Sequence, residues 1–334
     1  MTTALPAVQN LTIDEGSEGQ RLDNFLFKIL KGVPKTHVHR IIRSGEVRIN
    51  KGRADSSTKV AFGDIIRVPP VRVSDSIQEK LDKPAPGKEF PILFEDDFFI
   101  AIDKPSGTAV HGGSGVSFGV IEQLRRARPD AKFLELVHRL DRETSGVLLI
   151  AKRRSALTNL QAQFKERETG KTYLALVLGN YPANKKVIDA PLHKFLDSNE
   201  ERRVKVVAKD DPNGMKSVTL VKVREVFDPL SSSGRGLGRG AEPTTLLEVT
   251  IKTGRTHQIR VHLQSVGHVI AGDDKYGDFD KNKQLAKLGL KRMFLHAWRL
   301  QVTHPSTGEA MTIFAELPSE LSNFINTKNT TEVL

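Results

Sequence analysis

The sequence predicts a protein of two domains that mixes helices with strands. Apolar residues recur at helical spacing in several stretches, and in others they alternate or run together over the length of a strand. A polar, charged and proline-containing stretch over residues 74–89 shows neither pattern, so we expect a linker there. The chain has 334 residues, of which 38% are hydrophobic and 27% charged, and this composition is typical of a folded protein with a sizeable core.

The composition also excludes several classes of protein. No run of about eighteen apolar residues is present, so we expect no membrane-spanning helix and no membrane partner. The segment Met1 to Gln20 carries no basic residue ahead of an apolar core, which argues against a secretory signal and predicts a cytoplasmic protein. The chain contains no cysteine, which rules out disulfides, thiolate metal sites and cysteine nucleophiles.

Residues 19–73 predict a small domain of two helices followed by short strands. Leucine, phenylalanine and isoleucine fall at helical spacing over residues 21–30, and Gly32 ends that helix. Pro34 suits the first turn of a second helix that runs to Ser44, and short strands follow around two turns. Residues 1–18 are mostly polar and predict a flexible N-terminal lead with at most a short strand.

The positive charge of the chain is concentrated in this small domain. The net charge is +11, and residues 21–72 hold twelve Lys or Arg against four Asp or Glu, which accounts for +8 of it. Such a cluster is typical of a surface that binds RNA or DNA, although the charge could instead serve only solubility. The candidate phosphate contacts lie on the second helix and the segment after it: Lys35, Arg40, Arg43, Arg48 and Lys51.

Residues 90–320 predict a larger domain. The stretches typical of strands are 147–151, 173–179, 244–251 and 294–302, and residues 91–102 predict two strands joined by an Asp-Asp turn. The stretches typical of helices are 118–128, 157–167 and 255–266. Residues 228–243 are rich in glycine, serine and arginine and predict a mobile insertion, and residues 321–334 predict a C-terminal tail that frays.

One segment of the larger domain combines charge with an apolar run. Asp141 stands between Arg139 and Arg142, and a leucine-rich and β-branched run follows at 147–151. An ionised carboxylate aimed from the edge of a buried strand is a candidate catalytic site. The same spacing also fits a solvated group of ion pairs, and on spacing alone that structural interpretation is favoured.

Other motif-like stretches support neither a cofactor nor a metal. Gly113 and Gly236 each begin a glycine pattern, but Phe118 replaces the last glycine of the first, and no strand precedes the second. Lys165 stands where a phosphate-binding loop ending at Gly170 would need glycine. The histidines of the C-terminal half form no His-Glu-x-x-His pair and have no cysteine to complete a metal site. We therefore expect no nucleotide, no other cofactor and no metal.

Four ordered motifs suggest a family. They are KPSGTAVH at residues 104–111, HRLDRETSG at 138–146, KTYLALV at 171–177 and TGRTHQIRVH at 253–262. Together they resemble the pseudouridine synthases that modify large-subunit ribosomal RNA. The resemblance implies an α+β pseudouridine-synthase fold over residues 90–320, with a mixed, mostly antiparallel sheet and a central cleft. Residues 19–73 resemble the S4-type RNA-binding domain.

The resemblance assigns roles to four residues. Asp141 matches the essential aspartate, a nucleophile towards uridine. Arg255 matches the arginine that pairs with that aspartate, and Tyr173 matches the tyrosine that stacks on the flipped uracil and helps proton removal. Arg139 matches an arginine that replaces the extruded base in the RNA stack. The implied reaction consumes no cofactor.

The resemblance also implies a substrate. It indicates an isomerase that converts specific uridines of 23S ribosomal RNA to pseudouridine, acting as a monomer on free RNA or on an assembling large subunit. Glu143 departs from the family, in which aspartate is common, and the insertion at 228–243 leaves nearby RNA contacts open. The competing hypothesis is a non-catalytic ribosome-binding or assembly protein. Such a protein would have no reason to keep Asp141, Arg255 and Tyr173 together.

Overall fold

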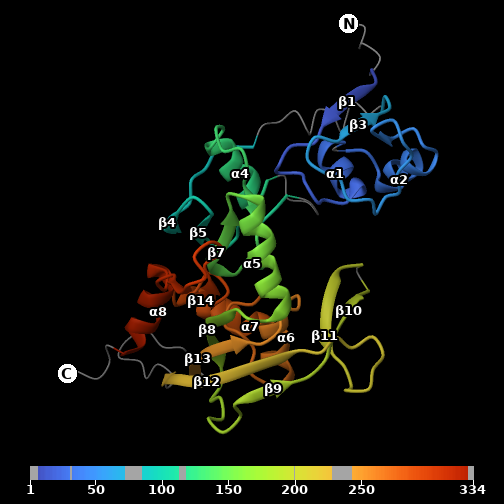
Figure 1. The fold of residues 1–334 in the computed structure, drawn as a ribbon. Coiled ribbons are helices and arrows are strands. Elements are labelled where there is room, and N and C mark those ends of the chain that lie inside the picture. Colours follow the sequence, from blue (N-terminus) through green and yellow to red (C-terminus); the bar gives the residue numbers. More distant parts are fainter. Residues whose placement is uncertain are drawn as a thin grey trace, which may run out of the picture.

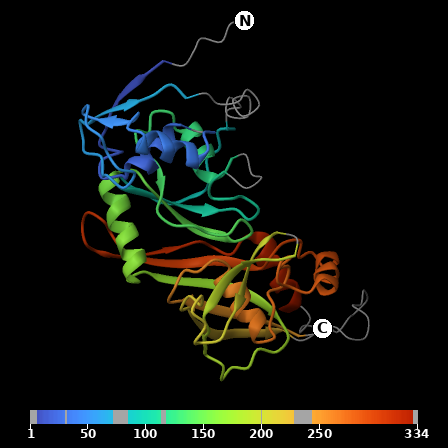
Figure 2. The ribbon, with the colours of Figure 1, turned by 90° about the vertical axis from the view of Figure 1, so that its right-hand side faces the viewer.

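The computed structural model describes residues 7–30, 32–71, 85–112, 118–198, 200–227 and 243–329. Figure 1 shows a small N-terminal domain beside a larger domain built on one long sheet, and Figure 2 shows the same arrangement from the side. The predicted α+β fold is therefore confirmed. Most of the predicted linker and nearly all of the predicted insertion fall in 72–84 and 228–242, outside the described residues.

The N-terminal domain packs two helices on a three-stranded sheet. Helices α1 (Leu22–Ile29) and α2 (Lys35–Arg43) form where the sequence predicts them, and α2 buries the apolar face made by Val38, Ile41 and Ile42. The sheet has the order β1 (Gln9–Thr12), β3 (Ile65–Val68), β2 (Arg48–Ile49).

Strand β1 corrects the predicted flexible lead. It pairs antiparallel with β3 from Gln9 to Thr12, and Ile13, which follows it, is only 1% exposed. Local sequence pattern barely indicates this strand, because its own residues are mostly polar and its partner lies more than fifty residues away. The N-terminal domain therefore begins before residue 19.

The larger domain holds a ten-stranded sheet with the order β4-β5-β7-β14-β8-β13-β12-β9, in which β15 also pairs with β14 and β6 with β7. All of these pairings are antiparallel except that between β7 and β14, so the sheet is mixed and mostly antiparallel as predicted. Its strands are β4 (Ile92–Glu95), β5 (Phe99–Lys104), β6 (Glu135–Leu136), β7 (Ser145–Ala151), β8 (Gly170–Leu178), β9 (Val187–Asp189), β12 (Val218–Phe227), β13 (Thr244–Ile251), β14 (Leu295–Thr303) and β15 (Ala310–Phe314). A separate hairpin consists of β10 (Leu192–Leu196) and β11 (Arg202–Val206).

Helices cover both faces of the central strands. All seven residues of β7 are buried: Val147 and Leu149 pack in the cluster that includes α5 (Arg154–Glu166), while Leu148 and Ile150 pack in the cluster that includes α4 (Val120–Ala127). Strand β8 likewise lies between α6 (Gln258–Ser265) on one face and α7 (Phe279–Lys287) on the other. A strand buried on both faces explains the continuous apolar runs in the sequence.

The C-terminal end differs from the predicted tail. Helix α8 (Ser319–Asn329) crosses the predicted domain boundary at residue 320, and Leu321 and Phe324 are 0% and 5% exposed. Both side chains belong to the core cluster that covers β8, so the larger domain continues into this helix. The apolar pattern of α8 is short and lies among polar residues, which is why the sequence did not predict it.

The two domains contact each other next to the central motif. The ammonium of Lys28 on α1 lies 3.3 Å from the carboxylate of Glu135 on β6, and Arg125 on α4 lies 2.8 Å from the same carboxylate. Strand β6 leads directly into the segment that carries Asp141. The N-terminal domain is therefore placed beside the strand that enters the candidate site.

Gly146 fixes the point at which β7 meets β14. Its φ is +108°, and a Cβ at this position would lie 2.3 Å from the carbonyl oxygen of Ala297. The substitution Gly146→Ala should therefore destabilise the protein by the backbone strain of about 1–2 kcal/mol and by a further overpacking cost of about 1–3 kcal/mol. Chemical denaturation measures the loss.

Gly107→Ala is the matched control. Gly107 has a φ of +79°, but no atom lies within 4 Å of its added Cβ, so this variant should show the strain alone. Equal losses in the two variants would contradict the close approach of the strands.

Candidate active site

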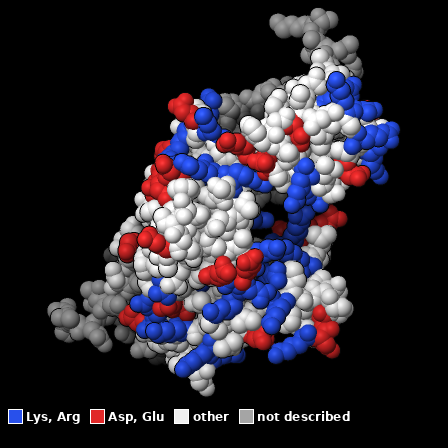
Figure 3. All heavy atoms as spheres, viewed as in Figure 1, with Lys and Arg blue, Asp and Glu red and all other residues white. Residues whose placement is uncertain are grey.

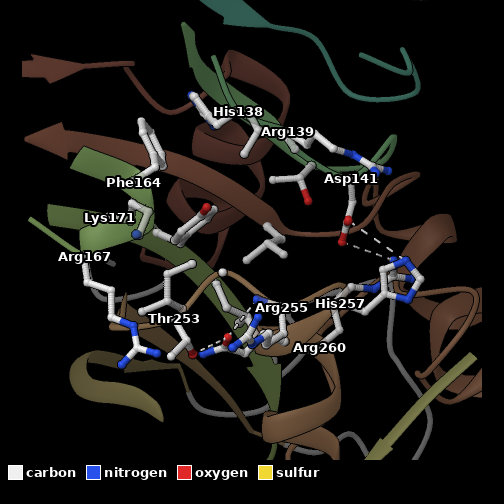
Figure 4. A pocket seen from close by; sticks show the side chains of 18 of the residues that line it. His138, Arg139, Asp141, Phe164, Arg167, Lys171, Thr253, Arg255, His257 and Arg260 are labelled. Atoms are coloured by element: carbon white, nitrogen blue, oxygen red, sulfur yellow. Dashed lines mark hydrogen bonds and ion pairs between the residues drawn. The ribbon is translucent and has the colours of Figure 1, made fainter. Parts of the chain in front are cut away.

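The four residues predicted for the active site line one open cleft. Its volume is about 470 Å³, and it lies between the segment before β7, the start of β8 and the loop before α6 (Figure 4). The described residues that line it are His138, Arg139, Leu140, Asp141, Thr144, Phe164, Lys165, Arg167, Lys171, Tyr173, Ile251, Thr253, Gly254, Arg255, His257, Gln258, Ile259, Arg260 and Leu295. Three motifs that are separated along the chain therefore meet in space.

His138 anchors the segment ahead of Asp141. Its ring stacks on Phe164 of α5 at 4.6 Å with an interplanar angle of 17°, and its Nε2 accepts a hydrogen bond from the backbone N–H of Leu149 at 3.2 Å. Burial lowers the pKa of His138 to about 4. The imidazole is thus neutral at pH 7, and it holds the segment against β7 and α5.

Lys104 and Ser106 anchor the segment after Asp141. The buried ammonium of Lys104 donates to the carbonyl oxygens of Pro105 and Thr108, each at 2.8 Å, and of Arg142 at 3.1 Å. The Ser106 hydroxyl donates to the carbonyl of Glu143 at 2.7 Å.

Burial lowers the pKa of Lys104 to about 7. The contacts of Lys104 and Ser106 with Arg142 and Glu143 show that the first of the four motifs, at 104–111, supports the second, at 138–146. The sequence did not reveal this role. Because both flanks of Asp141 are held, the backbone that carries its carboxylate is fixed at the edge of the cleft.

Arg260 is the guanidinium that faces Asp141. Its Nη1 lies 3.8 Å from one Asp141 oxygen, and its Nε and Nη2 donate to the two oxygens of Asp273, each at 2.7 Å. Burial is the largest single influence on the pKa of Arg260 and lowers it, but the hydrogen bonds to Asp273, together with the negative charges of Asp273 and Asp141, outweigh burial and raise the pKa. Burial alone would raise the pKa of Asp273, and the hydrogen bonds from Arg260 lower it. One buried cation thus links an internal carboxylate to the carboxylate in the cleft.

The predicted pairing of Arg255 with Asp141 is wrong in this structure. Arg255 lines the cleft, but its Nε points to the carbonyl of Lys216 at 3.4 Å, and no ion pair joins it to Asp141 within the described part of the chain. Helix α6 begins only at Gln258, so Arg255 lies in the loop before it, while Arg260 lies in the first turn. Arg260 was already inside the quoted motif, and a charged residue on a buried helix needs a partner.

Tyr173 lies on β8 and lines the cleft. Burial, together with the negative charge of Asp141, raises the pKa of the Tyr173 hydroxyl. The phenol is therefore neutral at physiological pH and can donate a hydrogen bond. Nearby, the ammonium of Lys171 lies over the ring of Phe164, and Lys165 and Arg167 line the same side of the cleft.

The site joins a fixed carboxylate, an aromatic hydroxyl and several cations. A carboxylate supplies a nucleophile, an aromatic ring offers a stacking surface, and cations at the rim suit phosphates. Within the described ranges, no three His, Cys, Asp or Glu side chains come together as a candidate metal site. None of the described helices has the length and apolar character that crossing a membrane requires.

Comparison with known proteins identifies the class of this protein. Residues 98–265 match the model of the RNA pseudouridylate synthase family, and residues 20–66 match the S4 domain. The chain belongs to the RNA pseudouridylate synthase family, whose members are isomerases. The resemblance read from the four motifs is confirmed, as are the predicted S4 domain and the enzyme class.

Individual relatives cover nearly the whole chain. Ribosomal large subunit pseudouridine synthase C of Yersinia pestis is 51% identical, over 96% of each chain. The protein of the same name from Pasteurella multocida is 50% identical over 96% of this chain and 93% of its own. The solved structure of Human RNA Pseudouridylate Synthase Domain Containing 4 is 27% identical, with a TM-score of 0.55, and covers 72% of this chain and 93% of its own.

The neutral state of His138 predicts a pH-dependent stability. Its pKa is about 4 in the folded protein against 6.5 for a free histidine, so the unfolded state takes up a proton first as the pH falls. The folded protein should lose up to about 3 kcal/mol of stability from this residue between pH 6.5 and pH 4, at about 1.4 kcal/mol per unit of pKa difference. Urea unfolding at several pH values measures this loss.

The variant His138→Gln keeps an acceptor for the Leu149 N–H but cannot titrate, so its stability should fall less steeply over the same pH range. Substituting the exposed His111 in the same way provides the control. An unchanged slope in His138→Gln would contradict the anchoring role.

Proposed function

We propose that this protein isomerises specific uridines of 23S ribosomal RNA to pseudouridine, with Asp141 as the nucleophile. The observation that carries the proposal is the position of Asp141: it is fixed on both flanks, faces Arg260 and shares a cleft with Tyr173. The names of the relatives that are about half identical over nearly the full chain support the ribosomal substrate. A protein with this substrate would act in the cytoplasm, on free RNA or on an assembling large subunit, as a monomer.

The reaction rearranges one nucleotide and needs no cofactor. The bond between ribose C1′ and uracil N1 breaks, a bond between C1′ and C5 forms, the proton on C5 leaves, and N1 gains a proton. Asp141 attacks the sugar or the base and is released again, so the carboxylate is regenerated. The nucleophile must be ionised and aimed before the substrate arrives, and the contact with Arg260 supports both.

Asp273 gives Arg260 a partner throughout the reaction. When Asp141 forms a covalent bond, its negative charge disappears, and a buried guanidinium without a partner would be costly. Because Arg260 keeps two hydrogen bonds of 2.7 Å to Asp273, the cation stays compensated. The covalent intermediate is therefore formed without leaving an unpaired buried charge.

A uridine inside folded RNA must swing out of the stack before it can enter the cleft. This costs a few kcal/mol, which contacts in the cleft and along the backbone must offset. Arg139 is exposed at the rim, and its side chain makes no hydrogen bond or ion pair with the residues described in this structure. We assign to Arg139 the place of the extruded base, to Tyr173 the stacking contact with uracil, and to Arg255 an RNA contact at the mouth.

The N-terminal domain supplies phosphate contacts. Lys35, Arg40, Arg43 and Lys51 are exposed, and Arg48 is half-buried. Figure 3 shows Lys and Arg gathered on the outer side of this domain and again across the middle of the same face. Such contacts carry little sequence information, so they would increase affinity and orient the RNA towards the cleft.

Replacing the nucleophile should separate catalysis from binding. Asp141→Ala should abolish pseudouridine formation, because no other group can take the place of the carboxylate, while RNA affinity stays within a few-fold. Carbodiimide mapping of large-subunit RNA, from cells lacking the protein and complemented with each variant, provides the measurement.

Glu143→Gln is the matched control, since Glu143 is two residues away and pairs only with the exposed Arg142 among the described side chains. Normal modification by Asp141→Ala would refute the enzyme mechanism and favour a protein that only binds.

Neutralising the cations of α2 should affect binding alone. The triple variant Lys35→Gln, Arg40→Gln, Arg43→Gln should lower RNA affinity and reduce the slope of log K against log salt by about 2, because each phosphate neutralised by a cation adds about 0.7–0.9 to that slope. The rate on saturating RNA should not change. Filter binding at several salt concentrations measures the slope.

The control triple variant carries glutamine at Lys283, Lys287 and Lys291, three exposed lysines on and after α7. Equal slopes for the two triple variants would exclude α2 as a phosphate-binding surface.

A further inference from the structure

His257 is a second group that faces Asp141, and the mechanism above does not use it. Its Nε2 lies 4.0 Å from an oxygen of Asp141, and Figure 4 shows the two side chains pointing toward one another. Its Nδ1 lies 2.8 Å from the hydroxyl of Tyr276, and that hydroxyl accepts the backbone N–H of Val204 at 3.1 Å. A line of polar contacts therefore runs from the hairpin strand β11 to the candidate nucleophile.

The direction of these hydrogen bonds follows from counting protons. The Tyr276 oxygen accepts the Val204 N–H and has one hydrogen of its own to donate. Among the described residues, the acceptor within reach of that hydrogen is Nδ1 of His257. A histidine that accepts at Nδ1 carries its proton at Nε2, so an N–H is aimed at Asp141.

The position of His257 is also fixed by its backbone. It has a φ of +51°, in the left-handed region, immediately before α6 begins. A residue other than glycine held in this conformation is strained and persists only where the surroundings determine it. Here the surroundings include the ring of Tyr276, which meets the imidazole edge-to-face at 5.4 Å.

Asp273 aligns this histidine together with Arg260. One of its oxygens accepts the backbone N–H of Lys275 at 2.9 Å and that of Tyr276 at 3.0 Å, and both oxygens bind Arg260. The Arg260 guanidinium in turn lies over the Tyr276 ring at 5.0 Å. A single buried aspartate thus sets the two groups that converge on Asp141.

We propose that His257 is a positioning residue for Asp141, donating its Nε2–H to the carboxylate, and that Tyr276 selects the tautomer that makes this possible. The separation of 4.0 Å is longer than a hydrogen bond, and contacts of this kind tighten when substrate fills a cleft. The donor orients the second oxygen of Asp141 while Arg260 orients the first. The proposal rests on the proposed function and specifies how its nucleophile is aimed.

The surroundings favour a neutral imidazole. Burial lowers the pKa of His257, and this effect outweighs the opposing attraction of Asp141. The other charged groups that act on it are Arg260, Lys275 and Asp273. A neutral donor can aim the carboxylate without adding a second full positive charge, which would compete with Arg260 and weaken the nucleophile.

Three substitutions separate the role of His257 as a donor from the role of the Tyr276 hydroxyl in selecting its tautomer. His257→Phe keeps a ring but removes the donor, His257→Gln keeps an N–H near Nε2, and Tyr276→Phe removes only the hydroxyl. The controls are Tyr181→Phe, which removes a buried hydroxyl bonded to the carbonyl of Lys185, and His268→Gln, which replaces a half-buried histidine elsewhere in the domain.

The probe is an unmodified 23S transcript carrying tritium at uridine C5, and release of tritium to water reports the reaction. In His257→Phe, kcat should fall about 10- to 100-fold, as expected for loss of an orienting hydrogen bond, with KM within about threefold. His257→Gln should restore most of the rate. In Tyr276→Phe the neutral imidazole of His257 loses the hydroxyl that donates to its Nδ1, so it should take up a proton at higher pH. The loss of rate on the acidic side of the pH profile should therefore begin at higher pH than in the wild type.

Two results would overturn the proposal. One is a wild-type kcat in His257→Phe, and the other is a pH profile of Tyr276→Phe that matches that of Tyr181→Phe. If His257→Phe does not fold, the profiles of Tyr276→Phe and His257→Gln decide the question. Failure of the wild-type protein to release tritium would instead refute the proposed function, so the two failures are distinguishable.

Discussion

The candidate active site depends on one buried cation, the Arg260 guanidinium, which lies between two carboxylates. Asp273 is 1% exposed and holds this cation with two short hydrogen bonds, while Asp141 is more open and faces the cleft. Removing one partner of a buried ion pair typically costs about 3–5 kcal/mol, because the other charge stays buried. The internal carboxylate therefore allows the outer one to change its charge during a reaction. The pairing of Asp273 with Arg260 also explains why Asp273, in a polar loop after α6, is buried inside the domain.

The rest of the fold holds this charge arrangement in place. Asp141 is fixed from two sides, by Lys104 at the end of β5 and by His138 stacked on α5, and β7 is buried on both faces directly after it. Arg260 comes from the first turn of a helix that packs on another part of the same sheet. These supports bring together a strand end, a helix and the first turn of another helix, so several elements of the fold hold the cleft. The basic N-terminal domain contacts β6 through the ion pair of Lys28 with Glu135, next to the segment that carries Asp141.

Much of this structure could be predicted from the sequence. The two N-terminal helices and the buried strands β7 and β8 follow from apolar periodicity, and the four motifs indicated both the family and the cleft residues Asp141, Tyr173 and Arg139. What could not be predicted depends on distant pairing: β1 is polar and finds its partner only in the folded sheet, and Asp273 meets Arg260 across a turn. The choice between Arg255 and Arg260 depends on where α6 begins, and helix ends are the least certain feature of a sequence pattern.

The most direct test of the account is a structure of the protein bound to an RNA stem that contains a target uridine. We expect that uridine to be swung out of its helix, with its ring against Tyr173 and an oxygen of Asp141 in contact with ribose C1′ or the uracil ring. Arg260 should still bind Asp273 in this complex. A uridine bound elsewhere, or an Asp141 carboxylate turned away from it towards solvent, would contradict the account.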